Sequence, residues 1–232
     1  MSKYALTMGK IVDLKKEQER TLQSPVMSAN IFLRILFWSI DFYYGKTRSL
    51  SKFKVVEILA RYPYMAWENH SYHALTRHYS FFHWVKKQTA DRHIELINLG
   101  RRSQDNEQWH LMIIEDLMRQ QNMEQHWFRS VLLPNIMAIK YHIFCKILYF
   151  FSKKSAFLMN ASFESHAEHE YMKMVAEHPE WEHTPVATAY FQYYPEQKTL
   201  ADLFRRIGLD ERDHMFESVS YTHLTLPTKR IV

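Results

Sequence analysis

The sequence predicts an all-α protein, a single helical bundle accompanied by apolar helices. Only four of its 232 residues are glycine and seven are proline, whereas strand-and-turn folds need both residues at frequent intervals. Aromatic residues make up 15% of the chain and charged residues 24%, which is typical of helices with wide apolar faces and charged backs. The length suits one domain with a sizeable buried core.

Six stretches have helical character. Residues 31–44 are strongly apolar but too short to cross a bilayer, so we predict an interfacial helix there. Residues 131–151 are long enough to cross, but Lys140, His142 and Lys146 would be costly at the bilayer centre, which favours a half-buried or core helix. The other helices are expected at 54–79, 91–121, 155–178 and 198–217.

Three segments are predicted from this pattern. Residues 1–53 form an N-terminal segment with the interfacial helix, and residues 54–219 form the bundle. Residues 220–232 combine β-type residues with a proline and lack the helical period of the bundle, so we predict that this tail is not native.

Charge and cysteine content indicate which partners and which cellular compartment suit the chain. The net charge of +5 is spread along the chain without a nucleic-acid motif, which favours a membrane surface over nucleic acid. Cys145 is the one cysteine, so the chain has no disulfide framework and suits a reducing compartment. The first twenty residues lack a signal-peptide core, and we expect a protein on the cytoplasmic side of a bacterial-type membrane.

Glu-x-x-His pairs are the strongest chemical signal, because residues three apart on a helix face the same side and can share a metal ion. Three pairs occur: Glu107/His110, Glu180/His183 and Glu211/His214. The pair at 180 stands between two prolines, where a regular helix is not expected, and is attributed to chance. The other two pairs lie in helical stretches, each preceded by a polar residue, Asn106 or Asp210, that could orient a ligand.

Lone glutamates complete the pattern of a carboxylate bundle, in which helices giving one Glu alternate with helices giving Glu-x-x-His. Glu164 occupies the helix between the two pairs, and Glu57 and Glu68 are both available on the helix before Glu107. Carboxylates bridge metal ions and imidazole suits iron, so the order predicts a centre of two iron ions. Taken singly, each of these residues could equally be ordinary helix polarity.

The motifs resemble those of the alternative oxidases, membrane-bound di-iron quinol oxidases, and most closely the plastid-terminal-oxidase branch. The resemblance runs from about Val55 to Glu217 and rests on residues 57–64, 106–111, 114–117, 163–171 and 210–214. Local motif favours Glu57 as the first ligand, whereas the separation from Glu107 favours Glu68. Gly208 and Leu209 stand where the family has an arginine, which puts any role of that arginine in doubt.

The resemblance implies a ferritin-like four-helix bundle with additional membrane-interface helices and two iron ions. The implied ligands are Glu57, Glu107, His110, Glu164, Glu211 and His214. Tyr171 is implied as a participant in the chemistry, although without the resemblance it would be taken for a packed core tyrosine. The implied reaction oxidises membrane ubiquinol or plastoquinol and reduces O₂ to water without proton pumping, in a homodimer.

Two other functions stay open at this stage. A di-iron hydroxylase of quinones or lipids uses the same ligands but needs a substrate pocket and an external reductant. A non-catalytic, membrane-associated iron-binding protein would hold the metal without turnover.

Overall fold

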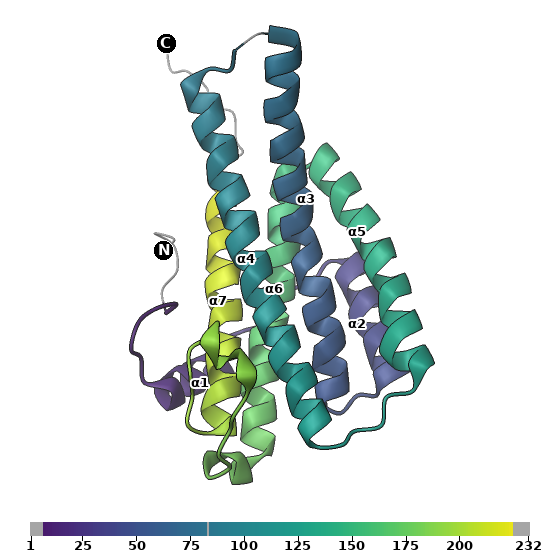
Figure 1. The fold of residues 1–232 in the computed structure, drawn as a ribbon, viewed down its shortest axis with the longest axis vertical. Helices are drawn as coiled ribbons and strands as arrows, with labels where there is room; N and C mark the ends of the chain where they lie inside the picture. The colour runs from purple at the N-terminus through teal and green to yellow at the C-terminus, as the bar shows by residue number, and fades with distance from the viewer. Residues whose placement is uncertain (1–6, 83, 225–232) are drawn as a thin grey trace. The chain divides into compact units, whose positions relative to one another are not determined.

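The computed structural model describes residues 7–82 and 84–224 (Figure 1). These residues form seven α-helices and no β-strand, which confirms the predicted all-α class. The chain divides into two compact units. The central unit is Phe53–Phe151, and the discontinuous unit combines Met1–Lys52 with Ser152–Val232.

Two long antiparallel helices dominate the central unit, α3 (Leu50–Phe82) and α4 (Lys87–Gln120). Lys54 Nζ lies 2.8 Å from Glu115 Oε1, and Gln104 Nε2 donates to Glu68 Oε2 at 2.6 Å. The start of α3 therefore lies beside the end of α4, as in an antiparallel pair. Gly100 allows the helices to approach closely. A Cβ atom there would lie 2.9 Å from Glu68 Cβ and 3.0 Å from the Tyr64 carbonyl oxygen.

Helix α5 (Leu133–Phe151), preceded by one π-helical turn at Phe128–Leu132, completes the central unit. One of its faces is buried and includes Tyr141, Cys145 and Tyr149. A second face exposes an apolar stripe of Ile136, Ile139, Ile143, Ile147 and Phe150. By length and composition alone, Phe128–Phe151 could cross a membrane, and 28% of its most apolar window is buried in the protein.

The discontinuous unit is built around a second antiparallel pair, α6 (Lys153–Glu177) and α7 (Leu200–Leu224), which lie side by side in Figure 1. Phe157 stacks on Tyr221 near one end of the pair, with ring centroids 5.6 Å apart. Tyr171 stacks on Phe204 towards the other end at 6.0 Å. Two short 3₁₀ turns, Pro179–Glu182 and Ala189–Gln192, lie in the connection between the helices.

Helix α2 (Ile31–Tyr44) has the bounds that the sequence predicted. It begins at Asn30, whose side chain accepts a hydrogen bond from the Leu33 backbone, and ends at Gly45 with a φ of +89°. Leu33 and Ile40 are buried. Its other side exposes an apolar stripe of Ile31, Ile35, Trp38 and Phe42, which repeats at the spacing of one helix face.

Helix α1 (Leu14–Gln23) was not predicted. It begins at Asp13, whose carboxylate accepts from the Lys16 backbone, and packs on α6 and α7 through polar side chains. Gln18 Nε2 donates to the Met172 carbonyl oxygen at 2.8 Å, and Arg205 Nε donates to Gln18 Oε1 at 2.8 Å. The helix is therefore held by hydrogen bonds to distant residues.

The predicted boundary at residue 220 falls inside α7, which continues to Leu224. Tyr221 is buried against Phe157, and Thr222 is also buried. Residues 225–232 lie outside the described part, so a foreign origin of the tail stays a prediction.

Candidate metal centre

The central unit gathers three predicted ligands, Glu57 from α3 and Glu107 and His110 from α4. All three side chains are completely buried. His110 Nδ1 lies 3.3 Å from Glu57 Oε2 and 3.6 Å from Glu107 Oε2. One donor atom from each residue lies within 4.8 Å of the others. We call this group the central half-site.

The discontinuous unit gathers an equivalent trio, Glu164 from α6 and Glu211 and His214 from α7. These side chains are at most 1% exposed, and one donor atom from each lies within 4.8 Å of the others. His214 Nδ1 lies 3.6 Å from Glu211 Oε2. Asn160 Nδ2 orients Glu164 by donating to its Oε1 at 3.0 Å, and it donates to Ser218 Oγ at the same distance. We call this group the discontinuous half-site.

The two half-sites have the same construction. In each, one helix supplies a single glutamate and its antiparallel neighbour supplies a glutamate and a histidine one turn apart. This is the alternation of ligands expected for a carboxylate bundle. The sequence predicted the repeated pattern, and the structure gives each copy its own helix pair.

The chemistry of the donors fits iron. Two carboxylates and one imidazole in a buried group need a positive charge to offset the cost of burial. A divalent ion supplies that charge, and nitrogen and carboxylate oxygen donors together suit iron. Two equivalent groups fit two ions.

Glu68, the rival first ligand, lies elsewhere. Its carboxylate accepts from Arg101 Nε at 3.3 Å and from Gln104 Nε2 at 2.6 Å, and 16% of the side chain is exposed. The structure therefore brings Glu57, and not Glu68, to Glu107 and His110.

Tyr171 lies on α6, seven residues after Glu164, and is completely buried. Gly208 on α7 faces it, because a Cβ atom there would lie 3.2 Å from Tyr171 Cβ and 3.0 Å from Met172 Cε. This close approach leaves no room for a large side chain at residue 208.

The two polar residues that precede the pairs have different surroundings. Asp210 is buried, and its carboxylate accepts from the Tyr194 hydroxyl at 2.6 Å and from Arg206 Nη2 at 2.6 Å. Burial alone would lower the pKa of Arg206, but the Asp210 carboxylate outweighs it and raises that pKa. Asn106 is half-buried on α4.

The remaining histidines of the motifs lie outside these groups. His166 stacks on Phe37, with ring centroids 4.0 Å apart, and its burial lowers its pKa. His169 contacts the carbonyl oxygens of Ser165 and Ser24. Glu180 and His183 are exposed, with Glu180 on a 3₁₀ turn, which agrees with the expectation that this pair arose by chance.

Sequence reasoning missed the polar residues that connect α7 to the N-terminal segment. Arg212, next to Glu211, donates from Nε to Glu168 Oε1 at 2.7 Å and also pairs with Glu17. Burial opposes the charge of Arg212, but the Glu168 and Glu17 carboxylates outweigh it and raise the pKa. Asp213 accepts from the Thr7 backbone at 2.9 Å. The one sequence signal was Asp13, a helix-capping residue before a charged run.

The family model described as alternative oxidase matches residues 7–222 of the chain. A search of curated proteins found no match.

Proposed function

The chain belongs to the alternative oxidase family, a family of di-iron enzymes that act on quinol and O₂ at membranes, and on this premise we propose a quinol oxidase. In this proposal it oxidises two molecules of membrane quinol and reduces one O₂ to water. The observation that carries the proposal is the pair of equivalent half-sites, each with two carboxylates and one imidazole.

The ligands in this proposal are Glu57, Glu107 and His110 for one ion, and Glu164, Glu211 and His214 for the other. Iron bound by these residues would supply the redox chemistry that couples quinol oxidation to O₂ reduction. The protein holds the donors in place on paired helices and excludes water by burying them.

Tyr171 is proposed to supply an electron and a proton during O–O cleavage. Its position on the ligand-bearing helix α6 and its complete burial support this role. Asn106 and Asp210 are proposed to orient ligands. Among these, Asp210 is fixed by Tyr194 and Arg206, so it can hold the start of the Glu211 motif in place.

The exposed apolar stripes of α2 and α5 support a monotopic attachment, in which each helix lies in the membrane interface. Lys140 and Lys146 are exposed on α5 and would reach the headgroups. Quinol would then enter from the lipid. We further propose the cytoplasmic side of a bacterial-type membrane, a plastid-terminal-oxidase-like substrate range of plastoquinol or ubiquinol, a homodimer, and no proton pumping in the electron-transport chain.

The test is O₂ uptake by membranes that contain the protein, with added quinol and with cyanide to inhibit haem oxidases. Uptake should persist in the wild type and fall to background in Glu164→Ala and His214→Ala. The matched controls Glu180→Ala and His183→Ala remove the exposed pair and should retain uptake.

Iron content separates the outcomes. A wild-type protein that carries two irons but shows no quinol-dependent uptake contradicts the oxidase. A hydroxylated product would then indicate a hydroxylase, and its absence would indicate an iron-binding protein.

A further inference from the structure

Four aromatic rings form a line through the discontinuous unit, where the 3₁₀ turn Pro179–Glu182 packs on α7. Tyr171 of α6 stacks on Phe204 of α7, with ring centroids 6.0 Å apart and an interplanar angle of 19°. Phe204 stacks on Trp181 at 5.1 Å and 30°, and Trp181 stacks on His178 at 4.2 Å and 10°. Tyr171 and Phe204 are completely buried, whereas Trp181 and His178 are half-buried. The line therefore leads from the interior of the unit to its surface.

An ion pair beside the stack holds Trp181 in place. Glu182 follows Trp181 in the turn, and Arg205 follows Phe204 on α7. Arg205 Nη1 donates to Glu182 Oε2 at 3.2 Å, and Arg205 Nη2 pairs with Glu182 Oε1. Lys15 Nζ of α1 lies 3.0 Å from the same carboxylate. Because the charged pair and the ring pair are neighbours in both segments, the ion pair fixes the indole against the Phe204 ring.

The chemistry of these rings goes beyond what core packing requires. Packing needs only apolar volume, which leucine or phenylalanine supplies as well. Phenol and indole are the two aromatic side chains that lose one electron most readily, and their oxidation potentials are similar. The Phe204 ring is not itself oxidised, but its stacked contacts join the phenol of Tyr171 to the indole of Trp181. An electron tunnels across two such contacts more readily than across a gap.

The central unit has a tyrosine at the equivalent position, but the tryptophan beside it is buried. Tyr64 stands seven residues after Glu57, as Tyr171 stands seven residues after Glu164. The Tyr64 ring meets Trp67 edge-on with centroids 5.0 Å apart, and both side chains are at most 1% exposed. An indole buried in this way cannot meet a reductant that is dissolved in water.

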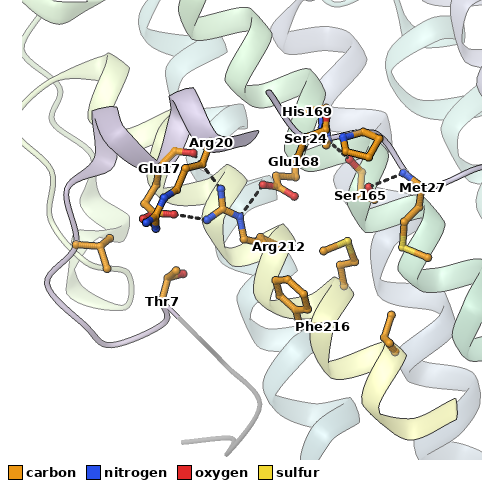
Figure 2. A pocket seen from close by; sticks show the side chains of 14 residues that line it. Thr7, Glu17, Arg20, Ser24, Met27, Ser165, Glu168, His169, Arg212 and Phe216 are labelled. Atoms are coloured by element: carbon orange, nitrogen blue, oxygen red, sulfur yellow. Dashed lines mark hydrogen bonds and ion pairs between the residues drawn. The ribbon is translucent and has the colours of Figure 1, made fainter. Parts of the chain in front are cut away.

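The cavity of the discontinuous unit lacks an oxidisable ring. It has a volume of about 610 Å³ and lies beneath the N-terminal segment (Figure 2). Its lining among the described residues includes Phe216, Met27 and Met215 but neither tyrosine nor tryptophan. Transfer of an electron from ring to ring therefore connects Tyr171 with Trp181 and not with the cavity.

We propose that Trp181 is the surface end of a protective electron path, which returns an electron to Tyr171 when quinol does not arrive. The source of a radical on Tyr171 rests on the proposed function, whereas the path rests on the geometry of the rings. A radical that stays on Tyr171 would oxidise the buried residues around it. The path moves the radical to a side chain that water and dissolved reductants reach.

Each step of the path conserves electrons and protons. Tyr171 becomes a neutral phenoxyl radical once it has supplied an electron and a proton. Trp181 then gives one electron through Phe204, and Tyr171 recovers the proton that it released. The indole N–H of Trp181 loses its proton to water, which leaves a neutral indolyl radical. A dissolved reductant of the thiol or ascorbate class supplies one electron and one proton and restores Trp181.

The test is pulse radiolysis of the full chain, loaded with iron in its oxidised state so that the metal does not donate the electron. Dibromide radicals oxidise accessible indole rings by one electron. Transfer then runs along the same path in reverse, from Tyr171 to the Trp181 radical. In the wild type the indolyl absorption should decay in a first-order phase while the phenoxyl absorption rises. The rate should not depend on protein concentration, because the transfer is intramolecular.

Matched variants assign this phase to the line of rings. Trp181→Phe keeps a ring in the stack but removes the indole, and Tyr171→Phe removes the phenol, so each should abolish the phase. Phe204→Leu keeps the apolar volume without the bridging ring and should slow it. Trp84→Phe removes an 81% exposed indole of the central unit and is the control, which should keep the phase. Iron content measured for each variant shows that the protein has folded.

A phase that survives in Trp181→Phe or Tyr171→Phe would overturn the proposal, as would its absence from the wild type. With O₂ and limiting quinol, Trp181→Phe should lose activity faster than the wild type, and equal loss would reject the protective role. Radical transfer in a protein without O₂ uptake would keep the path and reject the oxidase. O₂ uptake in a protein without radical transfer would do the reverse.

Discussion

At the scale of single residues, the structure gives different surroundings to Glu57, the predicted first ligand, and to its rival Glu68. Glu57 and Glu68 lie on α3, about three turns apart, and a local motif favoured the first while chain spacing favoured the second. The register of α3 against α4 sets Glu57 beside His110 and Glu68 beside Arg101, which favours Glu57 as the ligand. Such a register depends on contacts like Gly100 against Tyr64, which the sequence does not reveal.

Glu57→Gln should therefore reduce the iron content of the purified protein, whereas Glu68→Gln should leave it near the wild-type value. The amide is a neutral and poorer metal ligand, and only the first substitution changes the central half-site. Metal analysis after gel filtration measures the difference. Equal iron in both variants would exclude Glu57 as a ligand.

A second residue-scale prediction concerns acid stability. Hydrogen bonding from Arg205 lowers the pKa of Glu182 from 4.5 to about 2, and Lys15, 3.0 Å away, adds to the shift. Because the folded pKa is depressed, this carboxylate stabilises the fold above pH 4.5, and the contribution is lost as pH falls towards 2.

Glu182→Gln should accordingly flatten the dependence of the unfolding free energy on pH between about pH 5 and about pH 2. Urea unfolding at several pH values measures the slope. Glu196→Gln, an exposed glutamate in the same unit, is the control and should keep the wild-type slope. An unchanged slope in Glu182→Gln would show that the ion pair does not form in solution.

At the scale of helices, the sequence predicted elements whose apolar pattern is local and missed the one whose partners are distant. The bounds of α2 were predicted at 31–44, since its apolar run and its flanking residues are contiguous. Helix α1 has no comparable apolar face and is held by Gln18 and Thr21 against α6 and α7. Those partners lie more than 140 residues away in the chain, so no local window could reveal them.

The spacing within each helix pair yields a test. Gly100→Ala should destabilise the protein by about 1–3 kcal/mol, because the new Cβ meets Tyr64 backbone and would push α3 from α4. Gly208→Ala should cost less, because its nearest neighbour is the flexible end of Met172, and alanine is favoured over glycine in a helix. Chemical denaturation compares them. A larger cost at 208 would contradict this packing.

At the scale of the whole molecule, the apolar stripes of α2 and α5 predict how the protein meets lipid. Trp38→Glu or Ile143→Glu should each weaken co-sedimentation with vesicles by about tenfold. Each change removes the free energy gained when a large apolar side chain moves from water into the membrane interface. Ile94→Glu, at an exposed position on α4, is the control and should bind normally. Unchanged binding in both test variants would reject attachment through these stripes.

The division of the chain also constrains how the protein is made. The discontinuous unit needs residues before position 53 and after position 151. The whole central unit must therefore be synthesised before the discontinuous unit can fold completely. Glu17 and Thr21 of α1 bond to Arg212, which is among the last residues of the described chain to be synthesised. These bonds can form only after α7 has been made. Each trio of candidate ligands instead lies on one pair of consecutive α-helices. The nascent chain can thus form α3 and α4, with the first trio of candidate ligands, long before the partners of its N-terminal helix have been synthesised.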